Sequence, residues 1–358
     1  MKQVCLVTCY NQPDYIRART LRMAFGDVKN VKLIVVKNKH TGLLRYIEVL
    51  WQLIIVRITK QPDLYFLTFR GYEMLPFVRL ITFGKPLIFD EFINLVEWVV
   101  YEHHKFKASS LTTKALTGFY RFWLKSANLI VTDTQSHAEY SAKLMNIPLD
   151  KYVPLIVSTD EVTFGYIGQQ SKSKAGLFKV FYYGNMLPLH GVDIVIEAMV
   201  LLKDQGIELT LIGGKGKIDV AVEKARLAGA AIDYKTWVQF NDLPHYIEQA
   251  DVCLGGPFGS TTQSQFVITG KTYQFLQMGR PVIVGANLES GIFTDKDNAI
   301  VVEQADAEAL AGAILWSKQH PIQLDKIGES GKRLYQEKLS IKFLTKQLNL
   351  LLANKHIL

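Results

Sequence analysis

The chain has 358 residues, of which 49% are hydrophobic and 21% are charged. That length exceeds what one small hydrophobic core supports, so two domains are expected, and the composition excludes a disordered or low-complexity protein. The longest apolar segment, residues 46–58, contains Glu48, Gln52 and Arg57. These polar residues exclude a membrane-spanning helix, and we interpret the segment as a helix of the hydrophobic core.

Positive charge is concentrated in the amino-terminal half. The net charge is +8; residues 1–165 carry 21 Lys and Arg against 14 Asp and Glu, whereas the remainder carries 20 against 19. This asymmetry is typical of proteins that meet anionic lipid, a phosphorylated substrate or nucleic acid, although a surface that only maintains solubility has the same signature. Cys5, Cys9 and Cys253 lack metal-binding spacing and are interpreted as buried thiols of a reducing compartment. The amino terminus shows no signal-peptide pattern.

The amino-terminal half alternates short apolar runs with helical patterns. Strands are predicted at 4–9, 31–37, 63–69, 86–89, 129–133 and 152–157, and helices at 15–25, 43–59, 73–83, 111–127 and 135–146. Near-continuous apolar strands separated by helices favour a parallel sheet that is covered on both faces.

The alternation restarts after residues 166–176, which are rich in Gly, Ser, Lys and Gln and are predicted to form a linker. Strands follow at 180–183, 209–212, 234–238, 252–254 and 282–284, with a last short one ending at Glu303, and helices at 190–204, 218–229, 243–250, 267–278, 306–319 and 324–356. The pattern predicts an α/β protein of two Rossmann-like, doubly wound domains facing a central cleft. We place the domains at 1–165 and 177–335, and expect a carboxy-terminal helix, 336–358, to pack back on the first.

Residues 250–287 have the arrangement expected of a ligand site. The apolar strand 252–254 ends at a Gly-Gly-Pro turn, and a polar loop then leads into the helix predicted at 267–278. The carboxyl ends of strands in open α/β sheets bind ligands, and exposed N–H groups at a helix N-terminus favour anions. Lys271 adds a positive charge near the start of this helix. An ordinary strand-to-helix turn with a solvated lysine has the same pattern.

Several segments of the second half occur in the order typical of one enzyme family. They are 181–193 (FYYGNMLPLHGVD) with 196–198 (IEA), 209–216 (LTLIGGKG), 237–238 (WV) with 243–247 (LPHYI), 250–252 (ADV) and 271–282 (KTYQFLQMGRPV). Together they resemble the nucleotide-binding domain of GT-B glycosyltransferases of family 4, the glycosyl transferases group 1. Residues 15–21, 87–90 and 127–134 with His137 resemble the acceptor-side domain of some members.

The resemblance implies an enzyme that moves a hexose from a UDP- or GDP-sugar to a cell-surface glycan or lipid-linked acceptor. It further implies retention of configuration, no metal ion and no cofactor beyond the nucleotide-sugar substrate. Charge develops on the leaving diphosphate, so fixed cations and N–H donors are needed there. Lys271 and His190 are the candidates for this catalytic role, and Asp90 is the candidate for orienting the sugar or activating the acceptor. On other interpretations His190 and Asp90 only cap helices.

Further contacts are predicted from the same resemblance. The donor-binding candidates are Asn185, Gly213, Gly214, Lys215, Val238, Gly270 and Gln274. Asn11, Arg17 and Arg19 follow the first strand and are candidates for contact with phosphate or acceptor, surface arginines being the alternative. Trp237 is interpreted as a core residue rather than a stacking platform.

Three departures from the family pattern concern the donor. Asn185 and His190 stand where many members have Arg and Lys, and Gln274 and Phe266 stand where many have paired glutamates. The glycine-rich loop after the first strand is replaced by residues 10–14 (YNQPD). The amide of Gln274 can still contact a ribose hydroxyl.

Residues 103–125 interleave basic and aromatic side chains. This composition is typical of a helix at a membrane interface, although a core-facing helix with a basic outer face shares it. We therefore expect a cytoplasmic protein, peripheral at the inner face of the plasma membrane, whose partners are a nucleotide sugar, the acceptor and anionic lipid but not nucleic acid. A nucleotide-sugar epimerase or phosphorylase on the same fold, and a non-catalytic nucleotide-binding or scaffold relative, are the alternatives.

Overall fold

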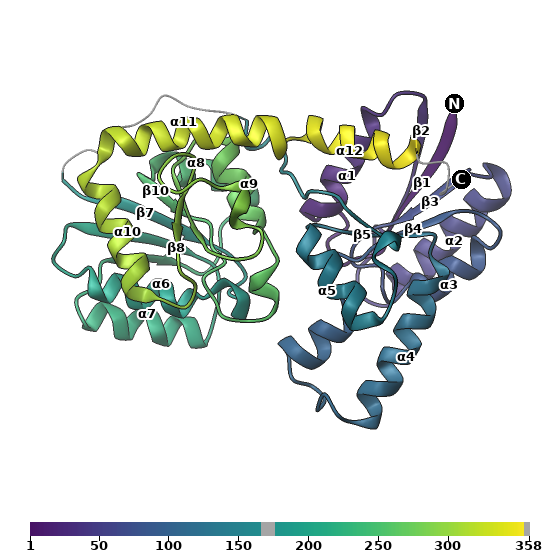
Figure 1. The fold of residues 1–358 in the computed structure, drawn as a ribbon, viewed down its shortest axis with the longest axis horizontal. Coiled ribbons are helices and arrows are strands. Elements are labelled where there is room, and N and C mark those ends of the chain that lie inside the picture. Colours follow the sequence, from purple (N-terminus) through teal and green to yellow (C-terminus); the bar gives the residue numbers. More distant parts are fainter. Residues whose placement is uncertain (166–175, 354–358) are drawn as a thin grey trace. The chain divides into compact units, whose positions relative to one another are not determined.

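The structure is a computed structural model that describes residues 1–165 and 176–353. Most of the predicted linker 166–176 and the last five residues of the predicted carboxy-terminal helix lie outside the described residues. The chain divides into two compact units: unit 1 comprises Met1–Ser158 and Ile341–Leu358, and unit 2 comprises Thr159–Ser340 (Figure 1).

Unit 1 contains a six-stranded parallel sheet in the order β2-β1-β3-β4-β5-β6 among its described residues. Its strands are β1 (Lys2–Thr8), β2 (Val31–Lys37), β3 (Leu64–Leu67), β4 (Leu87–Asp90), β5 (Leu129–Thr132) and β6 (Tyr152–Pro154). Its helices are α1 (Ile16–Gly26), α2 (Leu44–Thr59), α3 (Leu75–Ile81), a π-helical segment (Glu97–Glu102), α4 (Leu111–Ser126), α5 (Gln135–Met145) and α12 (Ile341–Ala353).

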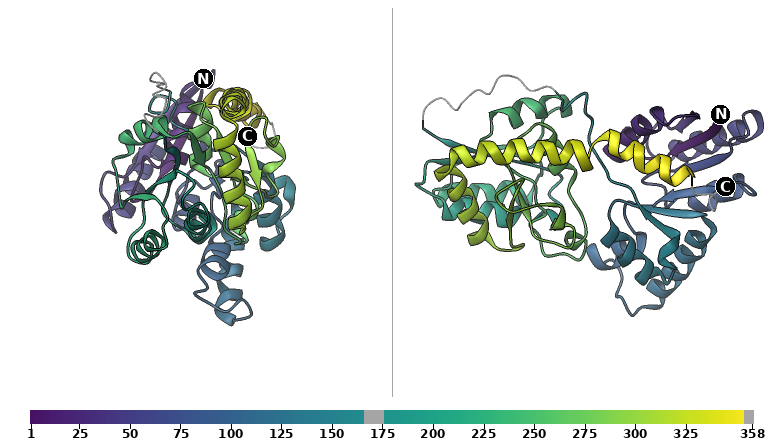
Figure 2. Two further views of the ribbon diagram at one scale, coloured as in Figure 1. Left: turned by 90° about the vertical axis from the view of Figure 1, so that its left-hand side faces the viewer. Right: turned by 45° about the horizontal axis from the view of Figure 1, so that its top comes forward.

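Two apolar layers enclose this sheet. Helices α2, α3, α4 and α5 pack on one face. On the other face lie α1 and α12, where Leu344 and Leu348 pack with Leu21 and Phe25. Figure 2 shows α12, in yellow, beside the purple amino-terminal elements. The sheet of unit 1 is therefore covered on both faces, as its apolar strands require.

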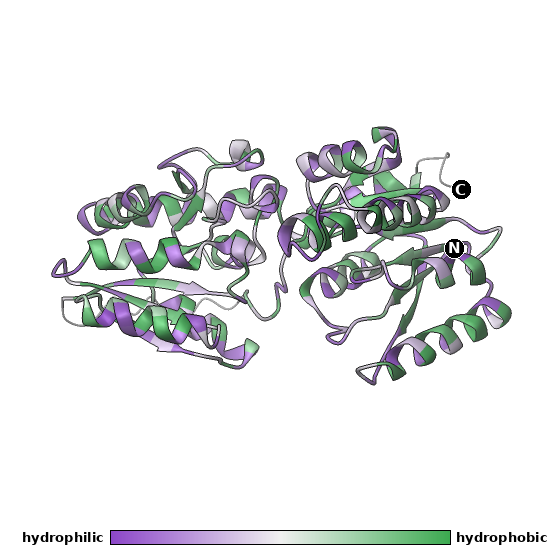
Figure 3. Ribbon diagram, turned by 90° about the horizontal axis from the view of Figure 1, so that it is seen from below, coloured by the Kyte–Doolittle hydropathy of each residue, from purple (hydrophilic) through white to green (hydrophobic). Residues whose placement is uncertain are grey.

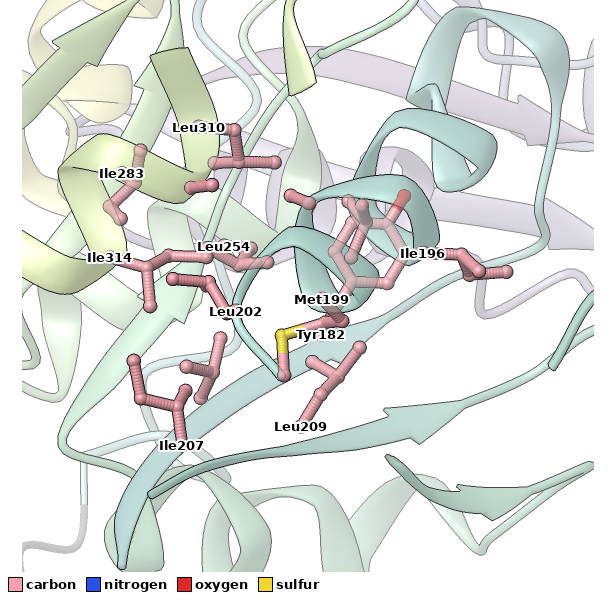
Figure 4. Packing of buried hydrophobic residues seen from close by; sticks show 14 of the residues in the cluster. Tyr182, Ile196, Met199, Leu202, Ile207, Leu209, Leu254, Ile283, Leu310 and Ile314 are labelled. Carbon is pink, nitrogen blue, oxygen red and sulfur yellow. The ribbon is translucent and has the colours of Figure 1, made fainter. Parts of the chain in front are cut away.

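Unit 2 repeats the architecture with the strand order β12-β11-β10-β7-β8-β9, again all parallel in the described part. Its strands are β7 (Phe178–Tyr183), β8 (Ile207–Ile212), β9 (Ile232–Lys235), β10 (Val252–Leu254), β11 (Val282–Gly285) and β12 (Ile300–Val302). Its helices are α6 (Val192–Leu201), α7 (Lys217–Leu227), α8 (Leu243–Gln249), α9 (Gly270–Gln277), α10 (Ala307–Gln319) and α11 (Pro321–Lys338). Figure 4 shows the core between the sheet and helices α6 and α10, where Met199 of α6 lies near Leu209 of β8. The predicted α/β class with two doubly wound units is confirmed.

Three local predictions are wrong. The helix predicted at 324–356 is two helices, α11 and α12, because Leu339 leaves the helical conformation and is buried. The strand predicted at 234–238 ends at Lys235, and Trp237 lies in the following loop with 71% of its surface exposed, so it is not a core residue.

Helix α2 also differs from its prediction. It covers the apolar segment 46–58, but only Val49 and Leu53 are buried, whereas Ile47 and Trp51 are exposed. A single helix layer touches the sheet with one face only, so an all-round apolar helix there leaves its other face uncovered. Among the described residues no helix combines the length and apolar character needed to span a membrane. All three cysteines are buried free thiols, as predicted.

Candidate functional site

The strand order of unit 2 reverses between β7 and β10. The chain runs from β7 to β8 and β9 on one side, and β10, β11 and β12 lie on the other. At such a reversal the loops that follow the two central strands diverge, and a crevice opens at the carboxyl end of the sheet. The two loops here are residues 184–191 and 255–269, and α9 begins directly after the second.

Lys271 and His190 meet at this reversal. Lys271 lies in the first turn of α9 with 5% of its surface exposed, and His190 ends a short 3₁₀ turn that precedes α6. The Nζ atom of Lys271 is 3.3 Å from Nδ1 of His190. The two predicted catalytic residues of the second half are therefore in direct contact although 81 positions separate them.

Burial sets the charge state of this pair. It lowers the pKa of Lys271 from 10.5 to about 7, and the ammonium lies 4.6 Å from the centre of the Tyr182 ring. Burial and then the charge of Lys271 lower the pKa of His190 well below its ordinary value, so the imidazole is neutral at pH 7. Nδ1 of a neutral imidazole that faces an ammonium accepts its hydrogen bond, and the ring proton then resides on Nε2.

Gly184 forms the floor beside this pair. A Cβ atom at Gly184 would lie 3.7 Å from Nζ of Lys271 and 3.9 Å from Cδ2 of His190. Because position 184 has no side chain, the space beside its backbone is bordered by the Lys271 ammonium and by the His190 imidazole, which donates through Nε2. Such a set of donors stabilises an anion such as a phosphate.

The glycine-rich loop after β8 packs on the same floor. Gly213 has φ +110° and a Cβ there would lie 2.1 Å from the carbonyl oxygen of Gly184, so only glycine fits. Its N–H donates to the carbonyl of Lys235 at 2.8 Å, which links the loops after β8 and β9. Gly214, next along the chain, also has a positive φ of +83°.

The remaining donor-binding candidates are distributed around this floor. Asn185 and Lys215 are exposed in the loops after β7 and β8, and Gly270 is the first residue of α9. Val238 is half-buried in the loop after β9, which lies two strands, or about 10 Å, from β7.

Gln274 is held by Tyr183, the residue before Gly184. Its side chain is 3% exposed, and the hydroxyl of Tyr183 donates to its Oε1. The bond fixes the orientation of the amide that stands at the position of one family glutamate. Phe266, at the position of the other, is buried and apolar.

Two of the three ionic candidates of unit 1, Arg17 and Asp90, form a fully buried salt bridge. Nε and NH2 of Arg17 donate to the Asp90 carboxylate at 3.0–3.2 Å, and NH1 donates to the carbonyls of Leu155 and Ile156 at 2.7–2.8 Å. The N–H of Phe69 donates to Oδ2 of Asp90 at 3.2 Å. These bonds tie α1 to β4 and to the chain after β6. The structure therefore gives both residues a structural role, and their predicted contacts with phosphate, sugar or acceptor stay a prediction.

Asn11 and Arg19 lie apart from that pair. Oδ1 of Asn11 accepts from the N–H of Gly42 at 3.1 Å and from NH1 of Arg45 at 2.8 Å, so it joins the loops after β1 and β2. Arg19 is half-buried in α1. Their contact with a substrate stays a prediction.

Sequence reasoning missed two contributors to the site. Tyr182 supplies the ring face beneath the Lys271 ammonium, and Tyr183 positions Gln274. The sequence signal was the run Tyr182-Tyr183-Gly184 at the end of a strand. Glycine leaves its backbone uncovered, and the aromatic side chains just before it lie next to that backbone. Within residues 1–165 and 176–353, no group of three or more His, Cys, Asp or Glu side chains is arranged to hold a metal ion.

Comparison with protein families finds one match. Residues 178–319, which include the Lys271 and His190 pair, match the family described as glycosyl transferases group 1. No curated protein sequence matches the chain.

Solved structures share the fold across nearly the whole chain. The crystal structure of HepE from Anabaena in complex with UDP-glucose has a TM-score of 0.73 and 11% identity, covering 99% of this chain and 100% of that one. Sucrose-phosphate synthase from Thermosynechococcus elongatus has a TM-score of 0.72 and 14% identity, covering 98% of each chain. A glycosyltransferase from Rickettsia africae has a TM-score of 0.68 and 11% identity, covering 99% of each chain. Identities this low show a common fold, which is GT-B.

Proposed function

We propose that this chain, whose residues 178–319 match the glycosyl transferases group 1 and whose fold is GT-B, moves a hexose from a UDP- or GDP-sugar to a glycan or lipid-linked acceptor. The observation that carries the proposal is the contact between Lys271 and His190 at the strand reversal of unit 2. HepE was solved with UDP-glucose, which supports a UDP-linked donor here.

The donor diphosphate accepts hydrogen bonds from Lys271 and from Nε2 of His190 above Gly184. A phosphate beside Lys271 raises the pKa of that ammonium from about 7, so the lysine is charged in the complex. The nucleoside extends along the loops after β8 and β9, with Gly213 and Gly214 beneath it and the backbone at Val238 against the base. The amide of Gln274 reaches a ribose hydroxyl.

The reaction breaks the bond between the anomeric carbon and the diphosphate oxygen, and the acceptor oxygen forms a new bond to that carbon. Negative charge grows on the leaving diphosphate, where Lys271 and His190 stabilise it without a metal ion. The acceptor proton passes to the leaving phosphate, and configuration is retained.

We further propose a peripheral membrane location on the cytoplasmic side for the enzyme. The support is the excess of basic residues in residues 1–165 and the interleaved aromatic residues of the segment 103–125. A non-catalytic nucleotide-binding role is the second candidate, and one observation favours it: an amide and a buried phenyl ring, at Gln274 and Phe266, occupy the positions of the family carboxylates.

Isothermal titration with UDP, GDP and ADP tests the donor site, and hydrolysis of the matching nucleotide sugars tests turnover. We expect binding of UDP or GDP over ADP, slow donor hydrolysis that persists in excess chelator, and a product whose anomeric configuration matches the donor by NMR. No binding of any of the three nucleotides would overturn the proposal. Binding without hydrolysis or transfer would favour the non-catalytic role.

A further inference from the structure

Helices α2, α3 and α4 of unit 1 expose an unusual number of large apolar side chains. On α2 the exposed fractions are 69% for Ile47, 65% for Trp51 and 68% for Ile58. Their spacing of four and seven positions places them in one stripe, opposite the buried Val49 and Leu53. A surface helix normally turns a polar stripe to water, so this stripe calls for a partner.

The same surface continues over α3 and α4. Phe77 on α3 is 52% exposed, Phe83 just after α3 is 77% exposed, and Phe119 and Phe122 on α4 are 57% and 65% exposed. Neighbouring helices in this layer are in contact, and NH2 of Arg57 on α2 donates to the carbonyl of Phe83 at 3.3 Å. Because the three helices cover one face of the same sheet, their exposed stripes all point away from that face. We call this surface, with Ile47, Trp51, Ile58 and these four phenylalanines, the α2–α4 face. Figure 3 shows hydrophobic stretches, in green, along helices of unit 1, at the right of the view.

An apolar groove opens within the α2–α4 face. It has a volume of about 540 Å³, and Phe77, Phe119, Trp98 and Trp123 are among the residues that line it. The guanidinium of Arg70 and the ammonium of Lys105 lie 5.1 Å and 5.5 Å from the centre of the Trp98 ring. Glu73 also lines the groove and pairs with Arg70 at 3.4 Å, so Lys105 is the cation that an anionic head would meet there. An apolar groove with a cation at its side matches a ligand with a hydrocarbon chain and an anionic head.

The charge on these helices selects among partners. Across α2, α3 and α4 there are six Lys and Arg, namely Arg45, Arg57, Arg79, Lys114, Arg121 and Lys125, against the single acidic residue Glu48. Two copies of so basic a face repel each other, whereas anionic lipid head groups attract it. Aromatic side chains with flanking basic residues are the composition of segments that lie in a membrane interface.

We propose that the α2–α4 face seats unit 1 on an anionic lipid leaflet, with its apolar stripes in the acyl boundary and the groove taking an acyl chain. This deepens the proposed function by naming the surface that brings the enzyme to a membrane-borne acceptor. It rests on residues of unit 1 that the donor site does not use. The two proposals can therefore fail separately.

Vesicle flotation of the full-length protein tests the inference. We expect binding to phosphatidylcholine vesicles that contain phosphatidylglycerol, weaker binding in high salt, and little binding to phosphatidylcholine alone. The double variants Ile47→Ser with Ile58→Ser, and Phe77→Ser with Phe119→Ser, should each lower partitioning about tenfold or more. The matched control is Leu227→Ser with Ile322→Ser in unit 2, where exposures of 83% and 73% are similar and no loss is expected.

Trp51 offers a second readout on the same face. Lipids brominated in their acyl chains should quench its fluorescence along with that of Trp98 and Trp123 in the groove. Trp51→Phe should therefore remove part of the quenching, whereas Trp237→Phe, in unit 2, should remove none. All the substituted side chains are exposed, and unchanged UDP binding and thermal unfolding verify that the variants are folded.

Three results would overturn the inference. They are wild-type protein that fails to bind the anionic vesicles, face variants that bind as well as wild type, and a wild-type dimer that the face variants dissociate. The last result would identify the α2–α4 face as an interface between copies. Loss of UDP binding in every protein would instead count against the donor proposal alone.

Discussion

The ammonium of Lys271 lies 3.3 Å from Nδ1 of His190, and burial keeps His190 neutral and leaves Lys271 only about half protonated at pH 7. A lysine with its pKa lowered to about 7 gains most from an anion, because the anion restores the charge that burial opposes. This relationship determines how the donor site should respond to substitution and to pH.

Replacing Lys271 should weaken diphosphate binding more than nucleoside binding. Lys271→Ala removes a charge-assisted hydrogen bond, worth about 1.5–3 kcal/mol, so UDP affinity should fall by roughly 10- to 100-fold. Uridine affinity should change little. Isothermal titration measures both, and Lys224→Ala, an exposed lysine of α7, is the control that should leave both affinities unchanged. Equal losses for UDP and uridine would mean that Lys271 has only a structural role.

The affinity for UDP should fall as pH rises above 7. The unliganded lysine loses its proton through its pKa of about 7, whereas the complex holds it to higher pH, so binding must take up a proton. The expected decline is up to about tenfold per pH unit until the pKa of the complex is reached. Lys271→Arg, whose guanidinium stays charged, should lose this dependence. A wild-type affinity that is flat from pH 7 to pH 9 would contradict the prediction.

Breaking the buried pair of Arg17 and Asp90 should cost stability rather than catalysis. Asp90→Asn or Arg17→Met leaves one charge buried without its partner, so the free energy of unfolding of unit 1 should fall by about 3–5 kcal/mol. Denaturant titration measures this loss. Asp14→Asn, which breaks the exposed contacts of Asp14 with Arg22 and Lys37, should cost less than about 1 kcal/mol. If folded Asp90→Asn protein bound donor normally yet lost transfer entirely, Asp90 would have a catalytic role.

An added methyl group at Gly213 should disrupt the floor of the donor site. The Cβ of Gly213→Ala would overlap the carbonyl oxygen of Gly184, and φ there is +110°, so a loss of about 2 kcal/mol or more in stability and a large loss of UDP affinity are expected. Thermal unfolding and titration measure the two effects. Gly312→Ala in α10 meets no atom within 4 Å and should be neutral or stabilising by up to about 1 kcal/mol.

The elements themselves could be predicted because their signals are local. Apolar runs mark the strands, and the loops after 184 and 254 meet because strands of a parallel sheet end at the same edge. For that reason Lys271 and His190 could be proposed as partners from the sequence.

Features set by tertiary contacts could not be predicted. The pairing of Arg17 with Asp90 joins residues 73 positions apart, and nothing near either one shows that both are buried. The apolar segment of α2 looks the same whether it is enclosed or has an uncovered stripe, because periodicity does not reveal how many layers surround a helix. The helix break at Leu339 has no Gly or Pro to mark it in the sequence. What distinguishes Leu339 is its burial, which is a tertiary feature.

Because of helix α12, the two units are not completed in chain order during synthesis. Unit 1 starts the polypeptide, yet Leu344, Leu348 and Leu351 of α12 supply part of the apolar layer over β1, β3 and β4. On a ribosome, unit 2 therefore has all its residues before unit 1 does. A nascent chain stalled after residue 158 would leave the part of the first sheet that α12 covers exposed, with only α1 on that face. Fragments cut at the boundary between the units should accordingly aggregate more readily than the full polypeptide.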